Sequence, residues 1–457
     1  MNLPLSSYQG SGQGPTRRTF LKSGLAMVGV GLGGAALAGC SSDNVASGLT
    51  ISRKDPSSVD YWNLFGGGDG VRMQEMQDGY RKTHPSVGLS AVTLAWGNPY
   101  YTKLSLATLG DKPPDVAVAH LTRAKTLIAS DLLEELTPDA LATVGITPDK
   151  LSRRAWDAGL VDGKAYTVPL DTHPIVTFYN TDICEKAGLL DSDGKLKPLT
   201  SEAAFMEAMA KGKAVSKAYG GVSPINNETA TPWRVFQSLY SQLGGEVLSD
   251  GGRKVVIDDD KAIKVLTLLD SLRKKKLFPS SVDYEGSIAM FANGQSAFLF
   301  QGEWEISTFQ TAKTAFSMAP FPNVYGGAKY ACQADSHTLC IPKQPTRDDK
   351  AFEQSLGFIR SLLDQSSTWA AGGHVPAWLP YANSPAFKKL SPQSDYAVAA
   401  DGAVYDPDGW YSGSGSDFEI ITGSAIGSVQ SGQQTPEAAL AQMRGKLEKL
   451  AGTASPI

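Results

Sequence analysis

The chain has 457 residues, of which 42% are hydrophobic and 19% are charged, and its formal net charge is −4. This balance is typical of a globular protein with two or three domains. It lacks the strong positive charge of a nucleic-acid-binding protein, so no nucleic-acid partner is expected. The four cysteines are too few to form a disulfide framework.

The N-terminal segment carries an export and anchoring pattern. Arg17 and Arg18, in "TRRTFLK", resemble the twin-arginine export motif, and an apolar run rich in glycine and alanine follows them. That run is too short and too weakly apolar to cross a bilayer. "LAGC", which ends at Cys40, resembles a lipobox, whose cysteine is lipidated. The pattern predicts a signal peptide over 1–39, a tether over 40–48, and a lipid anchor that holds the protein at the outer face of the cytoplasmic membrane.

Strand-like and helical segments then alternate along the chain. Apolar alternation predicts strands over 58–65, 87–96 and 113–120. Helical spacing predicts helices over 71–85, 100–110 and 124–136. This order indicates α/β architecture, in which helices cover the faces of sheets.

A second alternating region begins near residue 165. Its strand-like run contains Pro169 and Pro174, and because proline cannot donate to a sheet ladder, no interior strand is expected to run straight through Pro174. We interpret the segment as a crossing between two lobes. Helices are predicted over 200–215, where Thr200 or Ser201 can cap the first turn, and over 260–277.

Several segments of the chain carry a resemblance to a known family. They are "PPDVAVAH", "PLDTHPIVTFYNTDICEKAGL", "AMFANGQSAFLFQGEW", "MAPFPNVYGG", "HTLCIPK" and "TPEAALAQM". Each is weak alone, but "FYNTD…EKAGL" followed by "F.NG.SAF…GEW" is fairly specific. In this order they resemble the family 1 extracellular solute-binding proteins of ABC importers, especially the sugar-binding branch.

The resemblance implies a two-lobed fold of the periplasmic-binding-protein (Venus-flytrap) class that closes on a ligand between its lobes. Lobe 1 would hold residues 49–170 and 336–375, and lobe 2 would hold 171–335 and 376–457. The segments Pro169–Pro174, "ADSHT" and His374–Pro376 would be the crossings between the lobes. Gly372 and Gly373 would allow the backbone to change its φ and ψ angles at the last crossing. The implied partners are a mono- or oligosaccharide and the permease subunits of an importer. A monomer with no cofactor and no catalysis is expected.

Aromatic residues are the first candidates for a sugar site, because an aromatic face covers the C–H face of a sugar ring. Trp62, Trp304 and Trp378 each follow a strand or lie in a loop marked by glycine or proline. Trp233 and Trp410 are further candidates. Trp369 lies in a helical run and is expected in the core instead.

Polar candidates follow from position in the chain. His120 ends a buried strand, at the carboxyl edge where open α/β sheets bind ligands. Asp171 and His173 lie in the first crossing, and Glu303 precedes Trp304. For the histidines the alternative is a satisfied core or hinge position. For Glu303 it is a helix cap.

Other functions remain open at this point. The five histidines are scattered along the sequence without metal-binding spacing, so no metal is expected. A secreted carbohydrate-active hydrolase would need two carboxylates that flank the glycosidic bond to be cleaved. Asp171 and Glu303 are the candidates for this pair. A non-sugar solute such as a glycerophosphodiester would require several basic groups in the cleft. Cys332 and Cys340 are candidates for a disulfide, which sequence alone does not decide.

Overall fold

The computed structural model describes residues 57–327, 330–346 and 348–455. The predicted signal peptide and tether, with Arg17, Arg18 and Cys40, lie outside these residues. Within them, no helix combines the length and the apolar character that crossing a membrane requires.

The first sheet has five strands in the order β2-β1-β3-β12-β4. Their bounds are β1 Ser58–Asn63, β2 Gly88–Thr93, β3 Val116–His120, β4 Thr167–Pro169 and β12 His337–Cys340. β1 is parallel to both β2 and β3, whereas β12 is antiparallel to β3 and β4. β3 is buried along its whole length, as expected of a central strand covered on both faces. We call this sheet with its helices lobe 1.

Seven helices accompany this sheet, and they include the predicted ones. They are α1 Gly67–Thr83, α2 Asn98–Leu109, α3 Leu121–Ala129, α4 Pro138–Thr143, α5 Arg153–Gly159, α12 Asp349–Asp364 and α13 Ser366–Ala371. The helix predicted over 124–136 is wrong in its extent. α3 ends at Ala129, and Asp131 follows with a positive φ of 58°, a conformation that ends a right-handed helix.

The second sheet follows the order β14-β11-β5-β9-β6, with β10 and β13 also paired to β5. Its strands are β5 Asp171–Asn180, β6 Tyr219–Val222, β9 Ser296–Gly302, β10 Phe316–Pro320, β11 Cys332–Asp335, β13 Val375–Pro376 and β14 Ala403–Val404. A separate hairpin joins β7 Leu248–Ser249 to β8 Lys254–Val255. We call the second sheet with its helices lobe 2.

The helices of lobe 2 surround a second apolar core. The longer ones are α7 Glu202–Ser216, α8 Ala230–Gln242, α9 Asp259–Lys274, α17 Asp417–Ser431 and α18 Pro436–Ala451, and the shorter ones include α6 Thr181–Lys186, α10 Tyr284–Ala292 and α11 Ile306–Thr311. Ser201 caps α7 by accepting a hydrogen bond from the backbone N–H of Ala204, as one of the two predicted caps.

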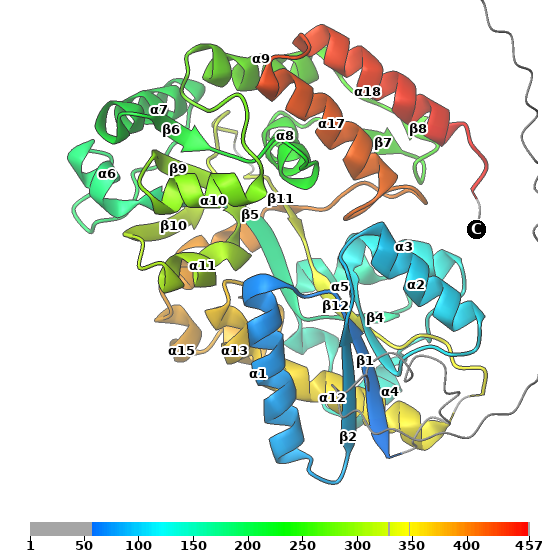
Figure 1. Cartoon of the computed structure of the whole chain (residues 1–457). Coiled ribbons are helices and arrows are strands. Elements are labelled where there is room, and N and C mark those ends of the chain that lie inside the picture. Colours follow the sequence, from blue (N-terminus) through cyan, green and yellow to red (C-terminus); the bar gives the residue numbers. More distant parts are fainter. Residues whose placement is uncertain (1–56, 328–329, 347, 456–457) are drawn as a thin grey trace, which may run out of the picture. The chain divides into compact units, whose positions relative to one another are not determined.

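The chain passes between the sheets at two single residues. Leu170 separates β4 in the first sheet from β5 in the second, and Ser336 separates β11 from β12 in the same way. Figure 1 shows β5 and β11 reaching from the helices of lobe 2 towards β4 and β12. A third passage lies near β13, where Gly373 adopts a φ of +113° and approaches the backbone of Glu303. Gly372 keeps a right-handed helical conformation.

The expectation that no strand runs through Pro174 is wrong. β5 is continuous from Asp171 to Asn180 and includes it. Residues 171–172 pair with β13 and residues 175–179 pair with β9, so Pro174 lies where the partner strand changes and pairs only with Ala334. The missing N–H therefore falls at an interruption of the ladder, where a proline is tolerated.

The candidate disulfide is absent from the structure, in which Cys332 and Cys340 are both free and buried. Cys332 lies on β11 and its thiol contacts the carbonyl of Ile175, while Cys340 lies on β12 and its thiol contacts the carbonyl of Ala117. Burial raises the pKa of each thiol to about 12. Thiols this weakly acidic are unreactive, so both residues act as small apolar side chains.

Candidate functional site

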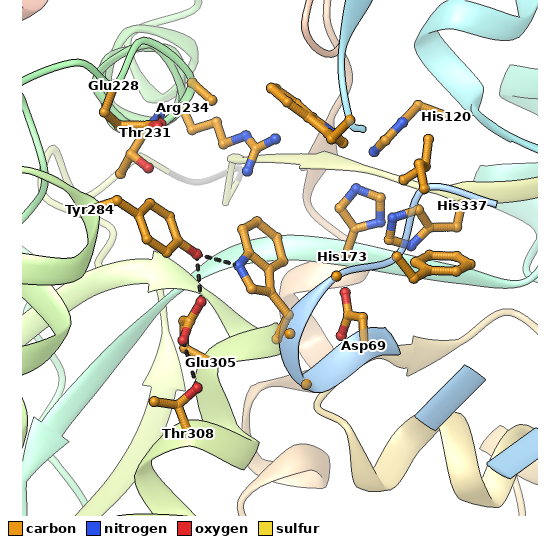
Figure 2. Close-up of a pocket in the computed structure, with 18 residues that line it drawn as sticks. Asp69, His120, His173, Glu228, Thr231, Arg234, Tyr284, Glu305, Thr308 and His337 are labelled. Atoms are coloured by element: carbon orange, nitrogen blue, oxygen red, sulfur yellow. Dashed lines mark hydrogen bonds between the residues drawn. The ribbon is translucent and has the colours of Figure 1, made fainter. Parts of the chain in front are cut away.

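A pocket of about 390 Å³ lies where the two lobes meet. Lobe 1 contributes groups that lie at the ends of its strands or shortly after them, among them Phe65, Asp69, Trp96, His120 and His337. Lobe 2 contributes groups from β5 and from the starts of its helices, among them His173, Glu228, Arg234, Tyr284, Trp304 and Glu305. Figure 2 shows Glu228, Arg234, Tyr284 and Glu305 on one side and the three histidines on the other.

Trp304 forms the aromatic wall that lobe 2 provides. Its indole folds back over Gly302, where a Cβ atom would lie 2.0 Å from the ring. The indole N–H donates to the hydroxyl of Tyr284 at 2.8 Å. These two contacts hold the ring at the wall of the pocket.

The hydroxyl of Tyr284 continues a short polar chain. It donates to Oε1 of Glu305 at 2.5 Å, and the hydroxyl of Thr308 donates to Oε2 of the same carboxylate at 2.9 Å. Figure 2 shows this chain along one side of the pocket. Burial raises the pKa of Glu305, and these two hydrogen bonds oppose that effect. The chain orients acceptors that suit sugar hydroxyls.

Three histidines form the opposite wall. The rings of His173 and His337 stack with centroids 4.0 Å apart, and the ring of His120 lies 4.9 Å from that of His337. Burial lowers the pKa of His120, and the neighbouring His337 and His173 lower it further. Burial and His337 also lower the pKa of His173, to about 3. His120 and His173 are therefore neutral at physiological pH.

Asp171 lies behind this wall and orients it. Its carboxylate accepts from Nδ1 of His173 at 3.0 Å and from Nδ1 of His337 at 2.8 Å. It also accepts from the indole N–H of Trp369 at 2.6 Å. Burial acts to raise the pKa of Asp171, but the charges and hydrogen bonds of the surrounding histidines outweigh it and hold the pKa well below its usual range. An ionised Asp171 fixes the proton of His173 on Nδ1, which leaves Nε2 as an acceptor.

His374 connects the third passage to both lobes. Its Nε2 lies 2.9 Å from Oδ1 of Asp69 in the first turn of α1, and its Nδ1 lies 3.1 Å from Oε1 of Glu303 in lobe 2. Its ring stacks on Trp369 with centroids 4.2 Å apart. Burial acts to lower the pKa of His374, but the charges of Asp69 and Asp171 raise it well above the usual value. His374 is therefore a buried cation.

The histidines that are scattered in the sequence thus converge in the fold. Asp171, His173, His337 and His374 place ligand-type atoms within 4.8 Å of one another. A metal would need a free electron pair from each residue. His374 is protonated, and Nδ1 of both His173 and His337 donates to Asp171. This donor set fits a hydrogen-bonded network better than a metal ion.

The structure brings some of the predicted site residues into the pocket. His120, His173 and Trp304 line it. Asp171 and Glu303 do not, because both carboxylates are fully buried behind it. Burial raises the pKa of Glu303 to about 7. The proposed hydrolytic pair, Asp171 and Glu303, therefore has no access to a bound glycoside in this structure.

The other four predicted tryptophans lie elsewhere. Trp62 and Trp378 pack against the core of lobe 1, where Lys103 covers Trp62 and Arg360 covers Trp378. Trp233 is fully buried in lobe 2, and its indole N–H donates to Asp406. Trp410 packs beside Tyr411 at the edge of the same core. None of the four lines the pocket between the lobes as the structure describes it. Trp369 is buried in the core, as expected.

Trp378 also bears on the domain boundaries. The family resemblance implies that residues 376–457 belong to lobe 2, yet Trp378 packs in the core of lobe 1 and pairs with Leu151 there. The chain therefore contacts lobe 1 again after β13.

Sequence reasoning missed most of the polar pocket residues. They are Asp69, Glu228, Thr231, Arg234, Tyr284, Glu305, Thr308 and His337. Asp69, Thr231, Arg234 and Tyr284 lie near the beginning of a helix. In the sequence, these residues could be found as polar side chains in the first turns of helices that follow strands, because such turns converge at one edge of a sheet.

This architecture defines the structural class of the protein. Two α/β lobes with a pocket between them form the fold of two-lobed solute-binding proteins. An ABC substrate-binding protein from Listeria monocytogenes, in complex with cycloalternan, shares it with a TM-score of 0.72 at 21% identity, over 88% of this chain and 100% of that one.

Residues 67–353 match the family described as "Bacterial extracellular solute-binding protein", and the chain belongs to this family. It is similar to the maltodextrin-binding protein MdxE of Bacillus subtilis, with 24% identity over 298 residues. That match covers 63% of this chain and 65% of the relative, so it spans slightly less than two thirds of MdxE. An arabinooligosaccharide-binding protein of Bacillus subtilis is 24% identical over 446 residues, which are 90% of this chain and 96% of that protein.

Proposed function

We propose that this protein captures a mono- or oligosaccharide between its lobes and delivers it, chemically unchanged, to the permease subunits of an ABC importer. The observation that carries the proposal is the composition of the pocket. The Trp304 ring faces it from lobe 2, and His120, His173 and Glu305 surround the same space. An aromatic face with a few oriented polar groups is the environment that a sugar ring needs.

Domain closure follows from the way the lobes are joined. The passages at Leu170, at Ser336 and near Gly373 are short, so motion between the lobes concentrates there. A sugar that contacts Trp304 on lobe 2 and His120 on lobe 1 stabilises the closed arrangement, because only that arrangement offers both contacts at once.

The cellular location of the protein is part of the proposal. Export by way of Arg17 and Arg18 and lipidation of Cys40 would hold it, as a monomer, at the outer face of the cytoplasmic membrane. The names of the similar proteins support the ligand class, since one is a maltodextrin-binding and another an arabinooligosaccharide-binding protein.

A sugar panel tests the proposal. The purified protein is melted with monosaccharides and with malto-, arabino-, galacto-, cello- and xylo-oligosaccharides, and with glycerophosphoglycerol for the non-sugar alternative. A ligand that binds only the folded state raises the melting temperature. We expect at least one sugar to do so and to be recovered intact after incubation. A shift with glycerophosphoglycerol alone, or conversion of the sugar, would contradict the proposal.

A further inference from the structure

Arg234 occupies an unusual position in the pocket. It lies in the first turns of α8, its side chain is 7% exposed, and its guanidinium carbon lies 5.1 Å from the centroid of the Trp304 ring. Figure 2 shows the guanidinium directed into the space between the lobes. Among the residues that the structure describes, no side chain or carbonyl forms a hydrogen bond or ion pair with it.

A guanidinium carries five donors and a permanent charge. The guanidinium nitrogens open into the pocket, so a ligand that displaces the water there must supply hydrogen-bond partners for them. The guanidinium lies over the Trp304 ring in a cation–π contact that uses none of its N–H donors. The donors of Arg234 are therefore available to a ligand in the pocket.

The acidic groups of the pocket are already engaged elsewhere. Asp69 is paired with His374. Glu305 accepts hydrogen bonds from Tyr284 and Thr308, and Oε1 of Glu228 accepts from the backbone N–H of Thr231 at 2.7 Å. None of these three carboxylates lies within ion-pair distance of Arg234.

The acidic groups behind Arg234 do not neutralise it either. Burial raises the pKa of Glu419 to about 8, even though the charge of Arg234 opposes this. Burial also raises the pKa of Asp406, whose Oδ1 accepts from the indole N–H of Trp233. Oε1 of Glu419 accepts from the backbone N–H of Gly415, and among the described residues neither carboxyl group forms an ion pair with Arg234.

The charge of the pocket sets a limit on its ligand. Arg234 is the one lysine or arginine among its described lining residues, and two of the three lining histidines, His120 and His173, are neutral. A single fixed cation matches a single negative charge. A doubly charged phosphate monoester would bring a second charge into a lining whose other ionisable side chains include the carboxylates of Asp69, Glu228 and Glu305.

We propose that the carbohydrate bound in this pocket carries a carboxylate, as a uronic acid residue does, and that Arg234 binds it through paired N–H donors. The planar fork of a guanidinium matches the two oxygens of a carboxylate. This inference rests on the proposed function, since it names the class of sugar that the same site takes.

The test compares sugars that differ only in charge. The probes are disaccharides containing one glucuronic or galacturonic acid residue, and the same disaccharides with the carboxylate reduced to a hydroxymethyl group. Glycerophosphoglycerol serves as the phosphodiester probe. Affinities are measured by titration calorimetry for the wild type, Arg234→Met and Arg234→Lys. Arg81→Met, an exposed arginine on α1, removes the same charge outside the pocket and serves as the control.

We expect wild type and Arg81→Met to bind a uronic acid disaccharide about 10- to 100-fold more tightly than its reduced counterpart, as charge-assisted hydrogen bonds predict. In Arg234→Met this ratio should fall close to one, and in Arg234→Lys it should be intermediate. Equal affinity for the charged and reduced sugars in the wild type would overturn the carboxylate inference while leaving sugar binding intact. Tighter binding of glycerophosphoglycerol than of any uronic acid would also overturn it. Failure of every sugar would remove the proposed function itself.

Discussion

His374 and Asp69 form an ion pair of 2.9 Å that joins the third passage between the lobes to the first turn of α1. The same imidazole lies 3.1 Å from Glu303 in lobe 2. One buried cation thus contacts a carboxylate from each lobe, directly behind the pocket. Its charge state therefore bears on how the lobes are held together.

Replacing Asp69 should change the titration of His374. Asp69→Asn keeps the shape of the side chain but removes its charge, so the pKa of His374 should fall. The measurement is an NMR titration of the imidazole protons. Asp78→Asn, on the same helix but paired with Arg81, is the matched control. An unchanged His374 titration in Asp69→Asn would rule out the ion pair as the source of its charge.

Glu303 should make the folded protein less stable as the pH rises towards neutrality. Its pKa is raised from 4.5 to about 7, so between these values the folded state binds a proton that the unfolded state releases. Stability is therefore lost as the pH rises through this window, by on the order of 3 kcal/mol. Glu303→Gln should flatten the dependence.

Chemical denaturation at pH 4.5, 6 and 7.5 measures this effect. His374 affects stability at higher pH than Glu303 does. Because its pKa is raised in the folded state, the stability that it contributes is lost only as the pH rises through that raised pKa. The exposed Glu75→Gln serves as the control for loss of a carboxylate. If Glu303→Gln keeps the slope of the wild type between pH 4.5 and 7, Glu303 is not the titrating group.

Gly302 should be essential for the position of Trp304. An alanine Cβ there would lie 2.0 to 2.2 Å from three atoms of the indole, so the ring must move. We expect Gly302→Ala to weaken ligand binding at least tenfold and to change the fluorescence of the apo protein. Gly445→Ala, in α18 with nothing within 4 Å of the new Cβ, should leave binding unchanged and stabilise the helix by up to about 1 kcal/mol. Wild-type affinity in Gly302→Ala would contradict the packing described here.

Cys40 should determine where the protein resides. Cys40→Ala removes the only thiol of the predicted lipobox, so the protein should appear in the soluble fraction with its ligand binding intact. Arg17→Lys combined with Arg18→Lys should block export. Fractionation followed by immunoblotting measures both. Normal membrane retention of Cys40→Ala would remove the lipoprotein interpretation.

The fold was predictable because its signals are local. Apolar alternation and helical spacing place β1, β3, α1 and α9 close to where they lie. Pro174 misled because the rule against proline in a strand assumes a continuous ladder, and the partner of β5 changes at that residue. The change depends on three strands distant in sequence, which periodicity does not reveal.

The site was predictable only in part. His120 ends β3 and Trp304 lies two residues after the end of β9, and both positions are visible in the sequence. Trp62 lies on a strand too, but its side chain packs on the core of lobe 1, and sequence alone does not separate the two cases. The convergence of His173, His337 and His374 depends on the passages between the lobes, so their spacing along the chain carries no sign of it.

The most direct test of ligand capture between the lobes is a titration of the best-stabilising sugar against wild type, Trp304→Ala and Trp62→Ala, with the apo melting temperature of each. Loss of the Trp304 face removes roughly 100 Å² of apolar contact at about 25 cal/mol per Å², so affinity should fall about 30- to 150-fold. Its apo melting temperature should change little, because the ring is only partly buried. Trp62→Ala should leave the affinity unchanged, since Trp62 lies outside the pocket. Unchanged affinity in Trp304→Ala, or an equal loss in Trp62→Ala, would contradict the account.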